Sequence, residues 1–180
     1  NALDLGERRL SALLDDYGTP TVEAALDAFS ARAEALMRAE IAALPDGRYS
    51  FDDFLDNDGI SDEPLRIALD LTIAGDAMTL DFSRSAPPCR GPLNIAYSTA
   101  VACCYVALKH IFPHVPANAG VLKPITFVIP DTTLLGVKPP KPVGGYTETI
   151  LRMIDTVFVA LSQACPERVN GCAYGRSEER

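Results

Sequence analysis

Residues 65–82 carry the pattern that most constrains the fold, because apolar residues recur at every second position on both sides of Gly75-Asp76. A period of two places successive side chains on opposite faces of a strand. The apolar positions are Leu65, Ile67, Leu69, Leu71, Ile73, Met78, Leu80 and Phe82. We therefore predict a β-hairpin that buries one face and leaves the other to polar residues.

Two helices are predicted before this hairpin. Residues 3–16 form the first, and Tyr17-Gly18-Thr19-Pro20 forms a turn in which Thr19 caps the second. Apolar residues then recur near the helical period from residue 22 to residue 44, until Pro45-Asp46-Gly47 ends the helix. This pattern predicts a helical hairpin over residues 1–46.

Residues 47–180 are predicted to form the α+β portion of the same module. Residues 49–51 read as a third strand, followed by an acidic loop over residues 52–63. A buried helix is expected over residues 91–108, a fourth strand over 125–129 and a last helix over 147–164. The predicted fold is α+β, with helices packed on a largely antiparallel sheet.

Charge and composition exclude several classes of partner. Sixteen basic and 24 acidic residues give a net charge of −8 with no basic tract, which argues against nucleic acid. The uncharged stretch 91–108 contains polar residues and many alanines, so it predicts a buried helix and no membrane anchor. Five cysteines without Cys-x-x-Cys spacing indicate reduced thiols and a cytoplasmic location.

Two motifs suggest chemistry that their context does not support. Asp56-Asn57-Asp58-Gly59 resembles part of a calcium loop, but its alignment places Leu65 where a bidentate Glu is required, which favours a solvated acidic turn. His110 and His114 have zinc-ligand spacing, yet Pro113 separates them and ends the helix. No metal site is predicted in this chain.

Cys89 is the best candidate for a thiol nucleophile. It lies in a loop beside Arg90 and near a predicted helix start, and both features favour a thiolate. The alternative interpretation is a structural thiol, because no Cys–His–acid triad can be assembled from the spacing. Cys103, Cys104 and Cys165 are expected to fill the core.

Two Gly-rich segments that begin predicted helices, 90–94 and 143–148, favour a binding site more than the other motifs do. Glycines and a capping Thr or Asn are what any helix start requires, so a scaffold role remains open. Free N–H groups at two helix starts, flanked by Arg90, Asn94, Asn118 and Glu148, would also suit a phosphate or a polarised carbonyl.

Several segments together resemble the C-terminal part of the hydantoinase B/oxoprolinase family. They occur in the family's order and at similar spacing, and the resemblance covers nearly the whole chain. The segments are Asp4–Leu10, Leu44–Tyr49, Asp81–Ser85, Cys89–Asn94, Asn118–Pro124, Ile129-Pro130 and Val143–Thr149. Because family members are several times longer, the chain is expected to be an excised fragment or a natural truncation.

The resemblance implies a function. Such proteins act with a hydantoinase A-type, actin-like ATPase subunit or domain: ATP phosphorylates the carbonyl oxygen of a cyclic amide, and the ring is opened by hydrolysis. Related assemblies, such as acetone carboxylases, activate ketones. ATP and a divalent metal are implied for the full complex and neither for this chain, which lacks a Gly-x-x-x-x-Gly-Lys motif and the N-terminal metal motifs. The isolated chain is expected to be inactive.

The resemblance also directs the choice of site residues. Glu148 and Asp81 are the predicted catalytic residues, with Glu148 as the base, and Arg90, Asn94 and Asn118 are predicted to bind the activated substrate. The alternative function is a non-catalytic assembly module that binds a partner subunit or the missing N-terminal region. The sequence leaves open self-association and the choice among hydantoin, 5-oxoproline, another lactam or a ketone.

Overall fold

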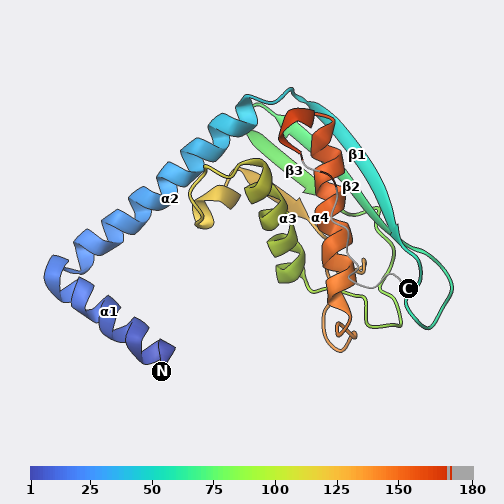
Figure 1. Ribbon diagram of the computed structural model, residues 1–180, viewed down its shortest axis with the longest axis horizontal. Helices are drawn as coiled ribbons and strands as arrows, with labels where there is room; N and C mark the ends of the chain where they lie inside the picture. Colours follow the sequence, from blue (N-terminus) through green and yellow to red (C-terminus); the bar gives the residue numbers. More distant parts are fainter. Residues whose placement is uncertain (170, 172–180) are drawn as a thin grey trace.

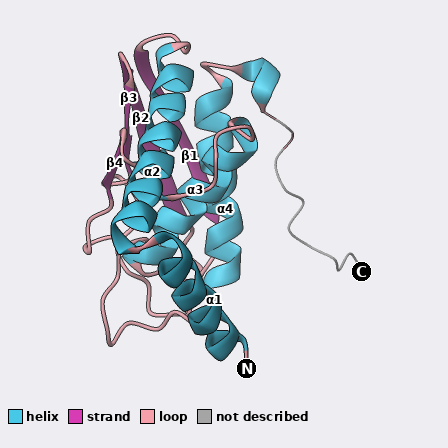
Figure 2. Ribbon diagram, turned by 90° about the vertical axis from the view of Figure 1, so that its left-hand side faces the viewer, coloured by secondary structure: helices cyan, strands magenta, loops and turns pink. Residues whose placement is uncertain are grey.

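The computed structural model describes residues 1–169 and 171 and arranges a four-stranded sheet with helices on one face (Figure 1). The strands are β1 (Gly47–Leu55), β2 (Leu65–Ala74), β3 (Ala77–Asp81) and β4 (Ile125–Val128), in that spatial order. Among these four strands, β3 and β4 pair in parallel and the other neighbours pair antiparallel. Helices α3 (Tyr97–Ile111) and α4 (Tyr146–Ser162) form the second layer (Figure 2). The predicted α+β fold is confirmed.

The predicted hairpin forms from β2 and β3, with Leu71 opposite Leu80 and Ile73 opposite Met78. Gly75 makes the turn with a φ of 59°, a left-handed conformation that favours glycine. The inward side chains, including Ile67 and Leu69, are buried in the main core. Alternation therefore assigns the two faces of the hairpin correctly, and the polar residues lie on the outer face.

Arg84 links three segments on that outer face. Its Nε lies 2.6 Å from Asp70 Oδ2 on β2, and its Nη2 lies 2.8 Å from Asp52 Oδ1 on β1. The guanidinium lowers the pKa of Asp70, and the two carboxylates raise the pKa of Arg84. Because Arg84 follows β3, this network joins the turn after the hairpin to two strands.

Helices α1 (Ala2–Tyr17) and α2 (Thr19–Ala42) meet at a bend at one side of the body (Figure 1). The prediction that Thr19 caps α2 is wrong. Gly18 makes the bend with a φ of 78°, and Thr19 and Pro20 are already helical. A Pro in the first turn is tolerated because the N–H it lacks would have no helical partner. The division of the chain at residue 46 stays a prediction.

Two other predicted boundaries are wrong. The buried helix begins at Tyr97 rather than at residue 91, because the N–H of Ile95 donates to Leu134 O (2.8 Å) and its carbonyl accepts from Val137 N (3.1 Å). Strand β1 extends through the first part of the predicted acidic loop. Asp53 faces the helices there and pairs with Arg152 of α4 at 3.5 Å.

The remaining expected elements, β4 and α4, form within two residues of their predicted bounds. Among the residues that the structure describes, no helix combines the length and the apolar character needed to cross a membrane.

Candidate functional site

The loop before α3 is held by the side chain of Asn94. This amide is fully buried: its Oδ1 accepts from Cys89 N at 2.9 Å, and its Nδ2 donates to the carbonyls of Cys89, Gly91 and Pro142 at 2.9–3.1 Å. Pro142 lies 48 residues further along the chain. One side chain therefore closes the 89–94 loop and ties it to the segment that leads into α4.

Asp58 fixes the same loop from the other side. Its Oδ2 accepts from the N–H groups of Arg90 (3.0 Å) and Gly91 (2.9 Å), and its Oδ1 accepts from Ile60 and Ser61 at 2.9 and 2.7 Å. Backbone hydrogen bonds, that from Ser61 first, lower the pKa of Asp58 to about 2. The expected solvated turn is therefore wrong for Asp58, which is buried and acts as an anionic crosslink.

Gly91 is required by the close approach of this crosslink. A Cβ at position 91 would lie 1.9 Å from the carbonyl oxygen of Asp58. No other residue type fits there without moving one of the two chain segments.

The start of α4 packs against the same loop. Gly145 N donates to Pro92 O at 2.9 Å, and the hydroxyl of the buried Thr149 donates to Leu93 O at 2.5 Å. A Cβ at Gly145 would lie 3.0 Å from Leu93 Cδ2, so the contact is tight. We name residues 89–94 and 142–149, together with Asp58, the loop clamp. The two Gly-rich segments predicted to form one site do adjoin.

Helices α3 and α4 both begin at the loop clamp (Figure 1). Neither helix has a side-chain cap, since Ala96 and Gly145 occupy the cap positions. Asn94 lies three residues before the first residue of α3, and Thr147 already lies within α4, so neither side chain caps a helix. Uncapped first-turn N–H groups and the positive ends of the helix dipoles give this end a partial positive charge.

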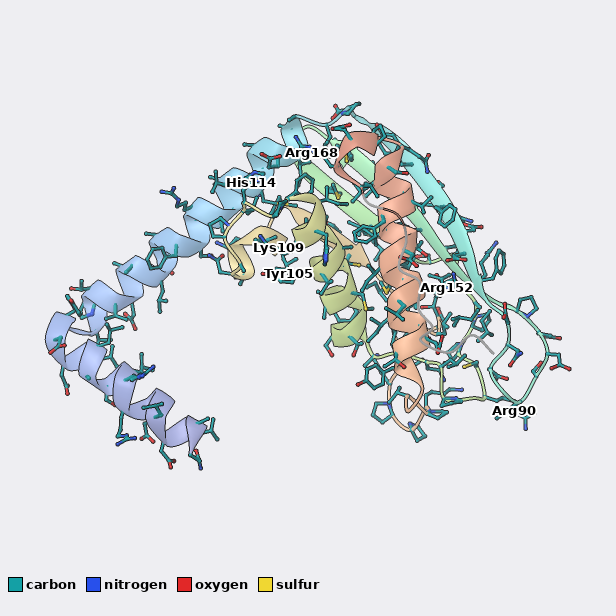
Figure 3. All side chains as sticks on the ribbon, in the orientation of Figure 1. Arg90, Tyr105, Lys109, His114, Arg152 and Arg168 are labelled. Atoms are coloured by element: carbon teal, nitrogen blue, oxygen red, sulfur yellow. The ribbon has the colours of Figure 1, made fainter. Side chains whose placement is uncertain are left out.

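The structure brings three of the five predicted site residues to the loop clamp. They are Asn94, Arg90 and Glu148. Arg90 has an exposed side chain and lies at the opposite end of the body from His114 and Arg168 (Figure 3). Glu148 is exposed in the first turn of α4. Contact of these residues with a substrate stays a prediction.

The other two predicted site residues lie elsewhere. Asp81 is the last residue of β3 and lies opposite Asp70 in the strand register. Its side chain lies on the outer face of the sheet, because its neighbours Leu80 and Phe82 point inward. Its carboxylate accepts from Ser83 N at 2.8 Å. Asn118 precedes the 3-10 helix η1 (Ala119–Leu122) and donates to Phe29 O of α2 at 3.2 Å. The predicted five residues do not converge on one point.

The environment of Cys89 does not favour a thiolate. Burial, supported by the nearby negative charge of Asp58, raises the pKa of the Cys89 thiol, and its sulfur donates to Gly91 O at 3.4 Å. Cys103, Cys104 and Cys165 are buried in the core as predicted. The described thiols are thus structural.

The two histidines do not point to a common site. His110 Nδ1 lies 2.8 Å from Val106 O within α3, and His114, beyond the helix end as predicted, lies 2.8 Å from Glu40 Oε1. Glu40 also pairs with Arg168 at 2.5 Å. Burial raises the pKa of Glu40, but these two hydrogen bonds outweigh it and the pKa is lowered. Within residues 1–169, no three His, Cys, Asp or Glu side chains are grouped so as to hold a metal ion.

A shallow groove of about 400 Å³ between α3 and η1 has no counterpart in the sequence predictions. Its walls are mostly apolar. They are formed by Ser98, Val101, Ala102, Tyr105, Asn118, Ala119 and Leu122. Tyr105 lies on the side of α3 that faces η1 (Figure 3). We name this feature the α3–η1 groove; no local signal predicts it, because its walls come from segments that only the fold brings together.

Comparisons with known proteins find relatives that match nearly all of this chain. The beta chain of the caprolactamase of Pseudomonas jessenii is 32% identical over 93% of this chain. A protein described as the B-type component of a D-/L-hydantoinase, from Pseudomonas sp. strain NS671, is 30% identical over 94% of it. The crystal structure of the ATP-dependent caprolactamase from P. jessenii superposes on 92% of this chain with a TM-score of 0.82 and 30% identity.

These relatives are much longer than this chain, which spans 29–31% of their length. A nucleotide-free acetone carboxylase shares the fold, with a TM-score of 0.72 at 18% identity over 80% of this chain and 22% of its own. The hydantoinase B/oxoprolinase family matches residues 1–179. The chain therefore belongs to the hydantoinase B/oxoprolinase family.

Proposed function

We propose that this chain works as part of a hydantoinase B-type subunit in the ATP-dependent hydrolysis of a cyclic amide of the hydantoin, 5-oxoproline or lactam type. The observation that carries the proposal is the near-complete match to one part of the ATP-dependent caprolactamase, in both sequence and structure. The family match over residues 1–179 supports it.

The chemistry explains why ATP is needed. An amide carbonyl is a poor electrophile, and phosphorylation of its oxygen makes that oxygen a leaving group. In the net reaction, the cyclic amide, ATP and two waters become the ring-opened amino acid, ADP and phosphate. A hydantoinase B-type subunit has to hold the activated ring, position water and stabilise developing negative charge.

The loop clamp is the part of this chain best suited to that task. The two uncapped helix starts beside its 89–94 loop offer N–H donors, and Arg90 and Glu148 lie exposed near them. In the proposal, Arg90 orients the activated substrate and Glu148 accepts a proton from water. Asn94 serves by holding the loop, because its amide is engaged by backbone groups.

ATP and a divalent metal belong to the rest of the assembly in this proposal. The described residues contain no cluster suited to a metal, and the sequence has no phosphate-binding Gly-x-x-x-x-Gly-Lys loop. An A-type ATPase subunit or domain would phosphorylate the substrate, consistent with relatives that are B-type or beta components of their enzymes. The free, reduced form of the four described cysteines suits a cytoplasmic location.

The test is an assay of the native assembly recovered through a tag on the polypeptide that carries this chain. Hydantoin, 5-oxoproline and caprolactam are added separately with ATP, and both ADP and ring-opened product are measured. We expect one of them to give ADP and product in equal amounts. Absence of amide-dependent ADP release with every cyclic amide would contradict the proposal.

A second candidate, the non-catalytic assembly module, is favoured by α1, which buries none of its residues. Turnover of Glu148→Gln in the assembly separates the two functions. A loss of at least about tenfold is expected if Glu148 is the base, with Glu167→Gln, an exposed residue next to Arg168 at the opposite end of the body, as the matched control. Unchanged turnover would remove Glu148 from the site and favour assembly.

A further inference from the structure

The apolar stripe of α2 continues beyond the body of the protein. Residues 22, 26, 29, 33 and 37 share one face of the helix at the 3.6-residue period. Ala33 and Met37 on that face are fully buried, whereas Leu26 and Phe29 are 61% and 62% exposed. The same stripe is therefore covered at Ala33 and Met37, where the body lies beneath it, exposed at Leu26 and Phe29, and buried again at Val22 near the bend.

Two further surfaces add to the exposed apolar residues of α2. Leu10 and Leu13 of α1 are exposed, so α1 adds a second apolar face. On the other side, Asn118 of the α3–η1 groove donates to Phe29 O, and a Cβ at Gly120 would lie 2.0 Å from Ser30 O. The groove thus begins where the exposed stripe of α2 ends.

A surface of this kind is unusual on a protein that works alone, because monomers rarely expose large continuous apolar patches. We define the arm as residues 2–30, which comprise α1 and the N-terminal part of α2. We propose that the apolar face of the arm and the α3–η1 groove form one docking surface for the remainder of a hydantoinase B-type subunit, which docks there through an apolar segment. This inference rests on the proposed function in so far as it takes the chain as part of such a subunit.

The relatives favour this occupant over a second copy of the chain. They match nearly all of this chain, yet about 70% of their own length lies outside the matched part. The caprolactamase superposition leaves out only 8% of this chain, which is fewer residues than the arm contains. At least part of the arm therefore has the same position in an enzyme whose additional polypeptide is available to cover it.

Thiol labelling tests the proposal without depending on activity. In the 180-residue chain, Leu26→Cys and Ala102→Cys report on the arm and the groove, and Ala24→Cys reports on the exposed opposite face of α2. The native thiols at 89, 103, 104 and 165 are buried, and Cys172→Ser removes the fifth. We expect a monomer in which all three introduced thiols react with a maleimide at rates within about threefold.

The same thiols are then placed at the superposed positions of the P. jessenii caprolactamase holoenzyme. We expect the positions matching 26 and 102 to react at least tenfold more slowly than the position matching 24. Equal rates there would overturn the proposal. A dimeric 180-residue chain with position 26 protected would also overturn it, by showing that a second copy is the occupant.

Failure of the proposed function gives a different result. If no cyclic amide stimulates ADP release in the native assembly while the labelling pattern holds, the reaction is wrong and the docking surface stands. If amide-dependent turnover is found but the caprolactamase positions react equally, the reaction stands and the docking surface does not.

Discussion

The loop clamp and the arm differ in how far the rest of this chain satisfies their polar groups and covers their apolar groups. Both contain glycines at a helix start, yet the loop clamp binds its backbone through Asp58, Asn94 and Thr149. The arm has one bend at Gly18, and α1 buries no side chain. A region whose polar groups are hydrogen-bonded within the chain can present a fixed site. A region with exposed apolar side chains is instead suited to being covered by another polypeptide segment.

Gly91→Ala should break the loop clamp most severely. The added methyl group would overlap the Asp58 carbonyl at 1.9 Å, so the loop or the 58–61 turn must move. We expect a loss of at least about 3 kcal/mol in the free energy of unfolding, measured by urea denaturation. Gly144→Ala is the control, because its Cβ would meet nothing closer than 4.0 Å. Equal stability of the two variants would refute the close approach.

Asn94→Ala comes next. It leaves Cys89 N and the Pro142 carbonyl without their partner in a buried loop, and we expect a cost of about 3 kcal/mol. Asn118→Ala removes a half-exposed cap of η1 and should cost only about 1 kcal/mol. Thermal unfolding of both variants checks the ranking. A larger loss of stability for Asn118→Ala than for Asn94→Ala would contradict the structural role assigned to Asn94.

Acid should weaken the loop clamp through Asp58. Its folded-state pKa is about 2, below the ordinary value of 3.8, so its stabilisation is present above pH 4 and is lost as the pH falls toward 2. Asp58→Asn should therefore be less stable than the unmodified chain at pH 7, and the difference should shrink toward pH 2. Denaturation curves measured across this range test the sign. A difference that stays constant with pH would show that the charge of Asp58 contributes nothing.

Phe29→Ala should have the smallest effect, within about 0.5 kcal/mol, because Phe29 is exposed in this chain. Met37→Ala lies on the same stripe of α2 but is fully buried, and it should cost about 2–4 kcal/mol. Chemical denaturation of this pair locates the point where the stripe leaves the body. A large cost at Phe29 would mean that the arm is already covered in the isolated chain.

The parts of this fold that the sequence predicts depend on local patterns, whereas the parts that it misses depend on contacts between residues distant in the chain. The hairpin over residues 65–82 follows from alternation, which is local, and the same alternation places Asp81 on the outer face, away from the helices. Local pattern misplaces the start of α3, because Ile95 bonds to residues 134 and 137. It also misses the role of Asp58, whose partners Arg90 and Gly91 lie 32 and 33 residues away, although Asp-Gly does mark a turn.

The candidate site is predictable only in part for the same reason. Glycines at 91 and 144–145 lie in the two segments that precede helices, and the fold does bring these segments together. No local sequence pattern shows that the Asn94 side chain is hydrogen-bonded to backbone groups, or that Asn118 faces α2. The α3–η1 groove needs segments distant in the chain to be positioned at once, so periodicity alone cannot reveal it.

Amide hydrogen exchange of this chain, measured alone and within the native assembly, tests the contrast between the two regions most directly. This contrast predicts that residues 2–30 exchange rapidly in the isolated chain and become protected on assembly, while the loop clamp is protected in both states. Unchanged exchange of the arm on assembly would contradict it, as would a loop clamp that gains protection only with its partners.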